Sequence, residues 1–170
     1  GIAASKDGDI FVTDVDLDQV IQIGSFSRTD RTFGGYGYGA GDLRSPGAID
    51  VNEKDVVAVC DTGNNRVVLF DRFGNYMRAF GEEALSEPRG VAFGANDILF
   101  VSDTSHNRVV AFDILSGQVA GRLGGPRAGD GPGSFAAPTG IAVDVDGETL
   151  LVADAGNHRI VKLKVLVLRK

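Results

Sequence analysis

The chain is poor in several residue types on which particular folds and sites depend. Its 170 residues include one cysteine, two histidines and no tryptophan. A single cysteine cannot form an internal disulfide, so the fold does not rest on a disulfide framework. No segment approaches the roughly 18 consecutive apolar residues of a membrane-spanning helix, so we expect no membrane span. The chain begins at Gly1 without an initiator methionine. We therefore interpret it as a processed or partial chain and assign it no compartment.

Basic charge is also scarce. The chain carries 17 Lys and Arg against 23 Asp and Glu, for a net charge of −6. Binding to nucleic acid depends on many Lys and Arg contacts with phosphates, so this balance argues against a nucleic-acid partner. Hydrophobic residues make up 43% of the chain, which is enough to build a core.

Glycine, in contrast, is abundant, and it belongs to an internal repeat. Among the 24 glycines, Gly90 and Gly140 stand in the pattern Pro-x-Gly-Ile/Val-Ala, which is followed by an apolar run that ends in Asp, and partial copies begin at Gly1 and Pro46. The terminal aspartates are Asp14, Asp61, Asp103 and Asp154. Their spacing of roughly 40–50 residues is typical of repeat architectures such as β-propellers.

Each copy contains short apolar segments separated by turn residues, and we predict these segments to be strands. In the third copy they are Gly90–Phe93, Ile98–Ser102, Arg108–Phe112 and Val119–Leu123. In the second, Val67–Phe70 and Met77–Phe80 repeat the pattern. Four short strands in about 42 residues form one blade of a propeller. We therefore predict an all-β propeller of four-stranded antiparallel blades, a single segment over 1–170 with repeats at about 1–46, 47–88, 89–138 and 139–170.

Three hairpin turns share a motif that resembles the Asp-x-x-Asn-x-Arg-hydrophobic signature of NHL repeats. They read Asp61-Thr62-Gly63-Asn64-Asn65-Arg66-Val67, Asp103-Thr104-Ser105-His106-Asn107-Arg108-Val109 and Asp154-Ala155-Gly156-Asn157-His158-Arg159-Ile160. The first copy departs from the signature, because Gln19 stands where Arg is expected. The resemblance implies a ring of about six blades. Lys164–Leu168 also lacks turn residues, so we expect the remainder of the protein or a partner chain to complete the ring.

The motif residues are the most regular polar residues of the chain. They could line a ligand channel, but a motif that recurs in every blade fits architecture better, because Asp and Asn stabilise tight turns. We expect the following residues to be structural: Asp61, Asn64, Arg66, Asp103, Asn107, Arg108, Asp154, Asn157 and Arg159.

The glycine-rich loop over 34–41 is a candidate contact surface. It is not followed by a helix and lacks Gly-Lys-Ser/Thr, so it does not fit a phosphate loop. Aromatic residues beside arginines are typical of protein interfaces. The candidate patch comprises Arg28, Arg31, Phe33, Tyr36, Tyr38 and Arg44.

Residues with catalytic or metal-binding potential do not converge in the sequence. His106 and His158 occupy turn positions in different repeats, and Cys60 aligns with small side chains. Asp14, Asp16 and Asp18 resemble the start of a calcium loop, but Gln19 and Ser25 stand where such a loop needs Gly and Glu. We therefore predict no catalytic, cofactor-binding or metal-binding residues.

The sequence thus favours a non-catalytic scaffold that binds a protein or ligand through the loops that connect its blades. Two alternatives come from the resemblance: a propeller hydrolase or lyase with a metal in its channel, and an NHL domain that binds RNA.

Overall fold

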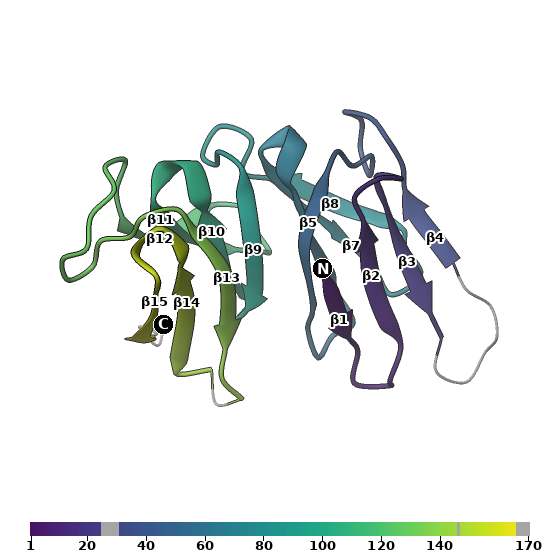
Figure 1. Ribbon diagram of the computed structural model, residues 1–170. Coiled ribbons are helices and arrows are strands. Elements are labelled where there is room, and N and C mark those ends of the chain that lie inside the picture. Colours follow the sequence, from purple (N-terminus) through teal and green to yellow (C-terminus); the bar gives the residue numbers. More distant parts are fainter. Residues whose placement is uncertain (25–30, 146, 166–170) are drawn as a thin grey trace. The chain divides into compact units, whose positions relative to one another are not determined.

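The chain folds entirely into short strands and tight turns. The structure, a computed structural model, describes residues 1–24, 31–145 and 147–165. These residues form fifteen strands and three short 3-10 turns (Figure 1). No helix in this part of the chain is long and apolar enough to span a membrane. The strands build four antiparallel sheets, which are named blades 1 to 4 in chain order, and they fall into two compact units.

The first unit, Gly1–Pro88, holds blades 1 and 2. In each blade the strands pair in chain order, as expected for successive hairpins. Blade 1 consists of β1 (Ile2–Ala4), β2 (Ile10–Asp14), β3 (Gln19–Ile23) and β4 (Arg31–Gly34). Blade 2 consists of β5 (Pro46–Val51), β6 (Val57–Asp61), β7 (Arg66–Phe70) and β8 (Tyr76–Phe80), with η1 (Thr62–Asn64) between β6 and β7.

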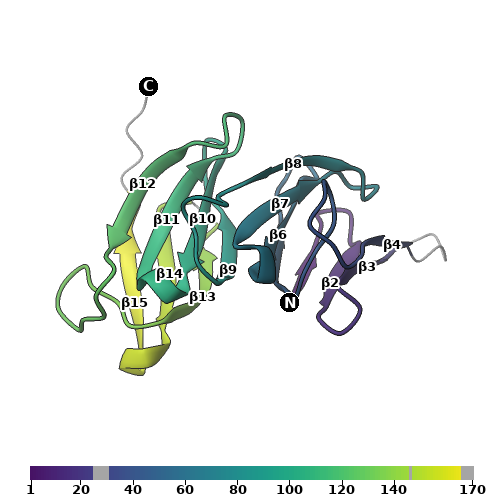
Figure 2. The ribbon, with the colours of Figure 1, turned by 90° about the horizontal axis from the view of Figure 1, so that it is seen from above.

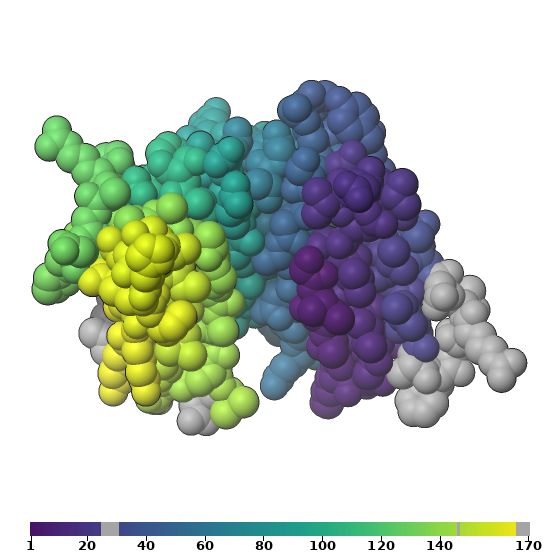
Figure 3. All heavy atoms as spheres, viewed as in Figure 1, coloured from purple at the N-terminus to yellow at the C-terminus, as the bar shows by residue number. Residues whose placement is uncertain are grey.

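The second unit, Arg89–Lys170, holds blades 3 and 4. Blade 3 consists of β9 (Pro88–Phe93), β10 (Ile98–Asp103), β11 (Arg108–Asp113) and β12 (Val119–Gly124), which lie side by side in Figure 2. Blade 4 consists of β13 (Pro138–Val143), β14 (Thr149–Asp154) and β15 (Arg159–Lys164). The turns η2 (Thr104–His106) and η3 (Ala155–Asn157) precede β11 and β15. The loop between β12 and β13, green in Figure 3, projects from this unit.

These sheets confirm the all-β prediction and each of the strands predicted from the third and second copies. Blade 4 has three strands within the described residues. The expectation about its outer strand falls largely on 166–170, which lie outside the described residues, and completion by a larger ring stays a prediction.

The core of each unit lies between the facing sheets of its two blades, because alternate residues of each strand point to the same face. In the first unit, Phe11 and Val20 of blade 1 pack with Val59 and Phe70 of blade 2. In the second unit, Phe100 and Val109 of blade 3 pack with Leu150 and Val152 of blade 4.

Hydrogen bonds from hydroxyl groups also join the two blades of each unit. The hydroxyl of Thr13 donates to the carbonyl of Gly47 at 2.7 Å, and the hydroxyl of Ser102 donates to the carbonyl of Thr139 at 2.5 Å. Both donors come one residue before the motif aspartate of their blade. The same register therefore joins blade 1 to blade 2 and blade 3 to blade 4.

Candidate functional site

Asp61, Asp103 and Asp154 are fully buried, and Asp61 and Asp154 each accept three hydrogen bonds around one hairpin turn. Asp61 ends β6, where its carboxylate accepts the backbone N–H of Arg44 at 2.6 Å, the amide of Asn64 at 2.8 Å and Nε of Arg66 at 2.7 Å. Asp154 repeats this set, with donors from Ala136 at 2.6 Å, Asn157 at 2.8 Å and Arg159 at 2.7 Å. A buried carboxylate needs such donors, because an unpaired buried charge is strongly destabilising.

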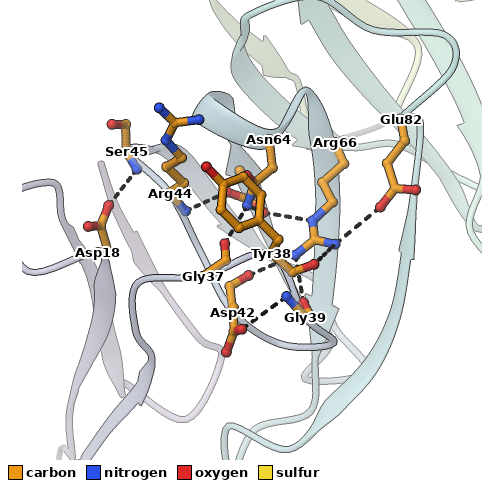
Figure 4. A network of polar contacts seen from close by, with 11 residues as sticks. Asp18, Gly37, Tyr38, Gly39, Asp42, Arg44, Ser45, Asn64, Arg66 and Glu82 are labelled. Atoms are coloured by element: carbon orange, nitrogen blue, oxygen red, sulfur yellow. Dashed lines mark hydrogen bonds and ion pairs between the residues drawn. The ribbon is translucent and has the colours of Figure 1, made fainter.

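The motif arginine holds the loop that enters its own blade. Nη2 of Arg66 donates to the carbonyls of Gly39 at 2.8 Å and Asp42 at 2.9 Å, and Nη1 contacts the Glu82 carboxylate at 3.1 Å (Figure 4). Asn64 adds a bond to the carbonyl of Gly37 at 2.9 Å. The rigid fork of the guanidinium suits this role, since it offers five donors in fixed directions.

In blade 4 the motif arginine and asparagine bind the loop between β12 and β13 in the same way. Arg159 donates to the carbonyls of Asp130 and Ser134, the second at 3.0 Å, while Asn157 donates to the carbonyl of Gly129 at 2.8 Å. The loop between β12 and β13 is therefore fixed to blade 4 as the loop 35–44 is fixed to blade 2.

Blade 3 varies the motif. Nε of Arg108 lies 2.6 Å from Asp103, and His106 takes the place of the motif asparagine, with Nδ1 2.9 Å from the same carboxylate. Asn107, which we grouped with Asn64 and Asn157, stands one position later in the turn. Its side-chain oxygen accepts the backbone N–H of Ala137 at 2.9 Å.

A second recurring position was not recognised from the sequence. The residue before the motif arginine adopts the left-handed conformation in every turn, with φ of 53°, 57°, 53° and 52° at Asp18, Asn65, Asn107 and His158. Three of these side chains accept the N–H of the residue before a strand-opening proline, from Ser45, Glu87 and Ala137. The available signal was the recurrence of Asp or Asn, residues that tolerate this conformation.

The pKa values of Asp61 and Asp154 are shifted in opposite directions, although the two carboxylates accept similar sets of hydrogen bonds. Burial raises the pKa of Asp61, and the hydrogen bonds from Asn64 and Arg66 only partly offset it. Burial acts in the same direction on Asp154, but there the hydrogen bonds from Ala136, Asn157 and Arg159 prevail and lower its pKa. The difference matches the exposure of the arginine partners, since the side chain of Arg66 is 6% exposed and that of Arg159 is 35% exposed.

The loop 35–44 presents part of the predicted contact patch. Tyr36 is 67% exposed and Tyr38 is 65% exposed, and their rings meet edge to face with centroids 6.3 Å apart. The guanidinium of Arg44 lies 5.7 Å from the centroid of the Tyr38 ring, within the range of a cation–π contact. The pKa of Tyr36 is raised, mainly by a side-chain hydrogen bond with Tyr38.

The structure separates the other predicted patch residues from this group. The Phe33 ring packs into the core of the first unit, with its centroid 4.8 Å from that of Phe70. Arg31 lies over the ring of Phe73, 5.5 Å from its centroid, in a different contact. Arg28 lies outside the described residues. The sequence showed that these residues are close along the chain but not which of them face solvent.

Local contacts give the loop 35–44 a defined shape. Leu43 is fully buried in the core of the first unit. The Asp42 carboxylate accepts the N–H of Gly39 at 3.0 Å. At Gly37, an added Cβ would lie 2.2 Å from an Asp42 carboxylate oxygen, so a larger residue would force this side chain to move.

The residues considered as metal ligands or nucleophiles take structural positions. Asp14 accepts the backbone N–H groups of Asp16 and Leu17, as in an Asx turn. Cys60 is fully buried, and burial is the main cause that raises the pKa of its thiol. Among the residues that the structure describes, no group of three or more His, Cys, Asp or Glu side chains is arranged to hold a metal ion.

Comparisons with known proteins agree on the repeat and on the fold. The family model described as NHL repeat matches residues 85–112 and 135–163. No curated protein sequence matches the chain. A streptogramin B lyase structure is similar over 97% of this chain and 54% of its own, with 15% identity and a TM-score of 0.72. Virginiamycin B lyase from Staphylococcus aureus is similar over 98% of this chain and 55% of its own, with 16% identity and a TM-score of 0.70.

A chain from a nidogen/laminin complex is also similar, over 96% of this chain and 59% of its own, with 19% identity and a TM-score of 0.76. The chain thus spans a little over half the length of these structures, and at such identities the likeness concerns the fold alone. Together with the repeated turns, these matches show that the chain contains NHL repeats at 85–112 and 135–163 and has a β-propeller fold.

Proposed function

We propose that the chain is a non-catalytic, protein-binding scaffold whose contact surface is Tyr36, Tyr38 and Arg44 on the loop 35–44. The proposal rests on the exposure of two tyrosines on this loop, whose backbone carbonyls are hydrogen-bonded by Arg66 and Asn64. A fixed loop favours binding, because little conformational entropy is lost when a partner is bound.

The side chains of this surface are those that recur at the centres of protein interfaces. Tyrosine and arginine are enriched among the residues that carry most of the binding energy. Aromatic rings and arginines also bind nucleic-acid bases, but the net charge of −6 opposes a polyanionic partner. The surface therefore suits a protein segment with apolar groups for the rings and an acidic group for Arg44.

The similar structures bear on this proposal in two directions. One belongs to a complex of two proteins, nidogen and laminin, which fits a binding role for the fold. Others are streptogramin B and virginiamycin B lyases, which makes catalysis the alternative. That alternative would place a metal in the channel, and among the described residues no group of three or more His, Cys, Asp or Glu side chains is arranged to hold one.

The test compares proteins captured by the wild-type chain and by the double variant Tyr36→Ser/Tyr38→Ser from an extract of the organism that encodes it. The captured protein is then purified and its affinity measured by calorimetry. We expect the double variant to bind at least about tenfold more weakly, since each ring is a candidate for about 1 kcal/mol or more.

Leu115→Ser is the matched control, because Leu115 is an exposed apolar residue in the β11–β12 turn. It should bind like the wild type. Equal affinity of the wild type and the tyrosine variant would rule out this surface as the contact site.

A further inference from the structure

The loop 35–44 has a structural counterpart in the loop between β12 and β13. The carbonyls of Gly37 and Gly129 each accept the side-chain amide of a motif asparagine. Arg44 and Ala136 each donate a backbone N–H to a motif aspartate at 2.6 Å. The two loops are therefore fixed by the same hydrogen bonds, with the same number of residues between the bonded positions.

The two loops differ in the side chains that they carry. The shared hydrogen bonds align Tyr36, Tyr38 and Arg44 with Ala128, Asp130 and Ala136, respectively. Because the same bonds form in both loops, the two tyrosine rings and the guanidinium are not needed to fix the backbone. Their presence on one loop and absence from the other indicate a role in contacts with another molecule.

Much of the backbone of the loop 35–44 is already hydrogen-bonded. The carbonyls of Gly37 and Gly39 accept bonds from Asn64 and Arg66, respectively. The N–H groups of Gly37 and Gly39 also donate to acceptors within the loop. These groups are not available to a ligand that binds as an added strand, a mode that depends on open backbone groups. Recognition at this loop therefore depends on its side chains.

The side chains of the loop form an aromatic surface that is rich in hydrogen-bond donors. The planes of the Tyr36 and Tyr38 rings lie 73° apart, and Gly37 between them has no side chain to cover the rings. One tyrosine hydroxyl is hydrogen-bonded to the other, which leaves the second hydroxyl to donate to a ligand. Arg44 is exposed beside the Tyr38 ring (Figure 4) and adds the donors of its guanidinium.

We propose, building on the function proposed above, that this surface binds a proline-rich segment of a partner protein with an acidic residue among the prolines. Proline has no N–H, so such a segment offers apolar rings and carbonyl acceptors to a surface of rings and donors. In the polyproline II conformation it rises about 3.1 Å per residue, so two residues span close to the 6.3 Å between the tyrosine ring centroids.

This conformation also reduces the cost of binding. It is largely formed before the ligand is bound, and its carbonyls make no internal hydrogen bonds that binding would have to break. The tyrosine rings pack on the prolines, a tyrosine hydroxyl donates to a ligand carbonyl, and Arg44 pairs with the acidic residue.

The test is an NMR titration of the isotopically labelled 170-residue chain. The probe is a blocked peptide of about ten residues, all proline except for one central glutamate, which adopts the polyproline II conformation. Its control has alanine in place of every proline and keeps the length and charge. We expect the proline peptide to bind at least about tenfold more tightly than the alanine peptide and to shift the signals of the loop 35–44.

Two variants locate the site. Tyr36→Ser/Tyr38→Ser should weaken binding of the proline peptide at least about tenfold, whereas Leu115→Ser should leave it unchanged. A proline peptide that binds the tyrosine variant as tightly as the wild type would overturn the proposal.

The pairing of Arg44 with the acidic residue is tested by a double-variant cycle. Glutamine in place of the peptide glutamate should weaken binding to the wild type about threefold, as expected for an exposed ion pair. The same change should have no effect on binding to Arg44→Gln. An equal loss with both proteins would contradict this pairing.

The failure of this inference is distinguishable from failure of the proposed function. A wild type that binds neither peptide, or binds both equally, would overturn the proline-rich ligand. If the captured partner described above still depends on Tyr36 and Tyr38, the protein-binding function stands and only the class of ligand is wrong. If that partner binds equally well without the tyrosines, the proposed function itself is wrong.

Discussion

At the scale of single residues, burial distinguishes motif arginines that look identical in the sequence. Arg66 and Arg159 make the same bond to the aspartate five residues earlier, at 2.7 Å. Arg66 is nevertheless almost wholly enclosed and has an additional partner in Glu82, whereas Arg159 is partly open to solvent. Removal of Arg66 leaves the buried Asp61 carboxylate without its charged partner. At Asp154, water can partly replace Arg159.

We therefore predict that Arg66→Ala lowers the free energy of unfolding by about 3–5 kcal/mol, as expected when one partner of a buried ion pair is removed. Arg159→Ala should cost less, about 1–2 kcal/mol, because its bonds are partly exposed. Urea denaturation of both variants measures these changes. Arg122→Ala, at an exposed position of β12, should stay within about 0.5 kcal/mol of the wild type. Equal losses at Arg66 and Arg159 would contradict the role assigned to burial.

The candidate contact residues illustrate what sequence proximity does and does not reveal. Tyr36, Tyr38 and Arg44 contact one another on one loop. Phe33 is only three residues from Tyr36, yet its ring lies in the core against Phe70. Which aromatic residue turns inward depends on contacts with blade 2, which no local pattern encodes.

At the scale of elements, the hairpin turn after the second strand in blades 1 and 3 is hydrogen-bonded to the residue before the first strand of the next blade. This turn needs a residue with a left-handed backbone and a side-chain acceptor. Asn107 provides both, with φ of 53° and an oxygen that accepts the N–H of Ala137. Asn meets both at once, because its side chain carries an acceptor and it tolerates this conformation.

Two substitutions should separate these requirements. Asn107→Gly retains the conformation and loses the acceptor, so we expect a loss of about 1 kcal/mol. Asn107→Ala loses the acceptor and also places alanine in an unfavourable conformation, so its loss should be larger by about 1 kcal/mol. Thermal and urea unfolding of both proteins will measure the difference. A glycine variant that is no more stable than the alanine variant would show that backbone strain has no part in this turn.

At the scale of the whole molecule, the carboxylates that hold the turns set the response to acid. Burial alone would raise the pKa of Asp71, but hydrogen bonds from Asn75 and Phe73 outweigh it and lower the pKa. The pKa of Asp144 is lowered mainly by its hydrogen bonds with Thr149, and that of Asp154 is also lowered. The pKa of Asp61 is raised, so this residue has the opposite effect on the pH dependence of stability.

A group with a lowered pKa releases its proton more readily in the folded state, so the unfolded state binds more protons at acid pH. Its contribution to stability is therefore present above the unfolded value, about 3.9, and is lost as the pH falls toward the lower folded value. We predict that the urea midpoint declines from pH 5 to pH 3. Asp71→Asn should reduce the steepness of this decline, since one titrating group is removed while an acceptor oxygen remains. An identical slope for both proteins would contradict the assignment at Asp71.

The sequence by itself determined the repeat, the strands and the turns. Their signals are local: the Pro-x-Gly pattern, the apolar runs that end in Asp, and the motif that closes with Arg all act within one hairpin. Such short-range patterns specify β-hairpins without reference to the rest of the chain, which explains why the predicted strands of the second and third copies match β7 to β12 closely.

Tertiary structure alone decided which partners the motif residues meet and which surfaces remain open. The guanidinium of Arg66 finds the carbonyls of Gly39 and Asp42 more than twenty residues away in the sequence. Ile2 and Ile49 occupy equivalent positions in their blades, but Ile2 is exposed and Ile49 is buried. The reason is physical: a strand's pattern specifies that a face is apolar, whereas its burial depends on whether another sheet packs against it.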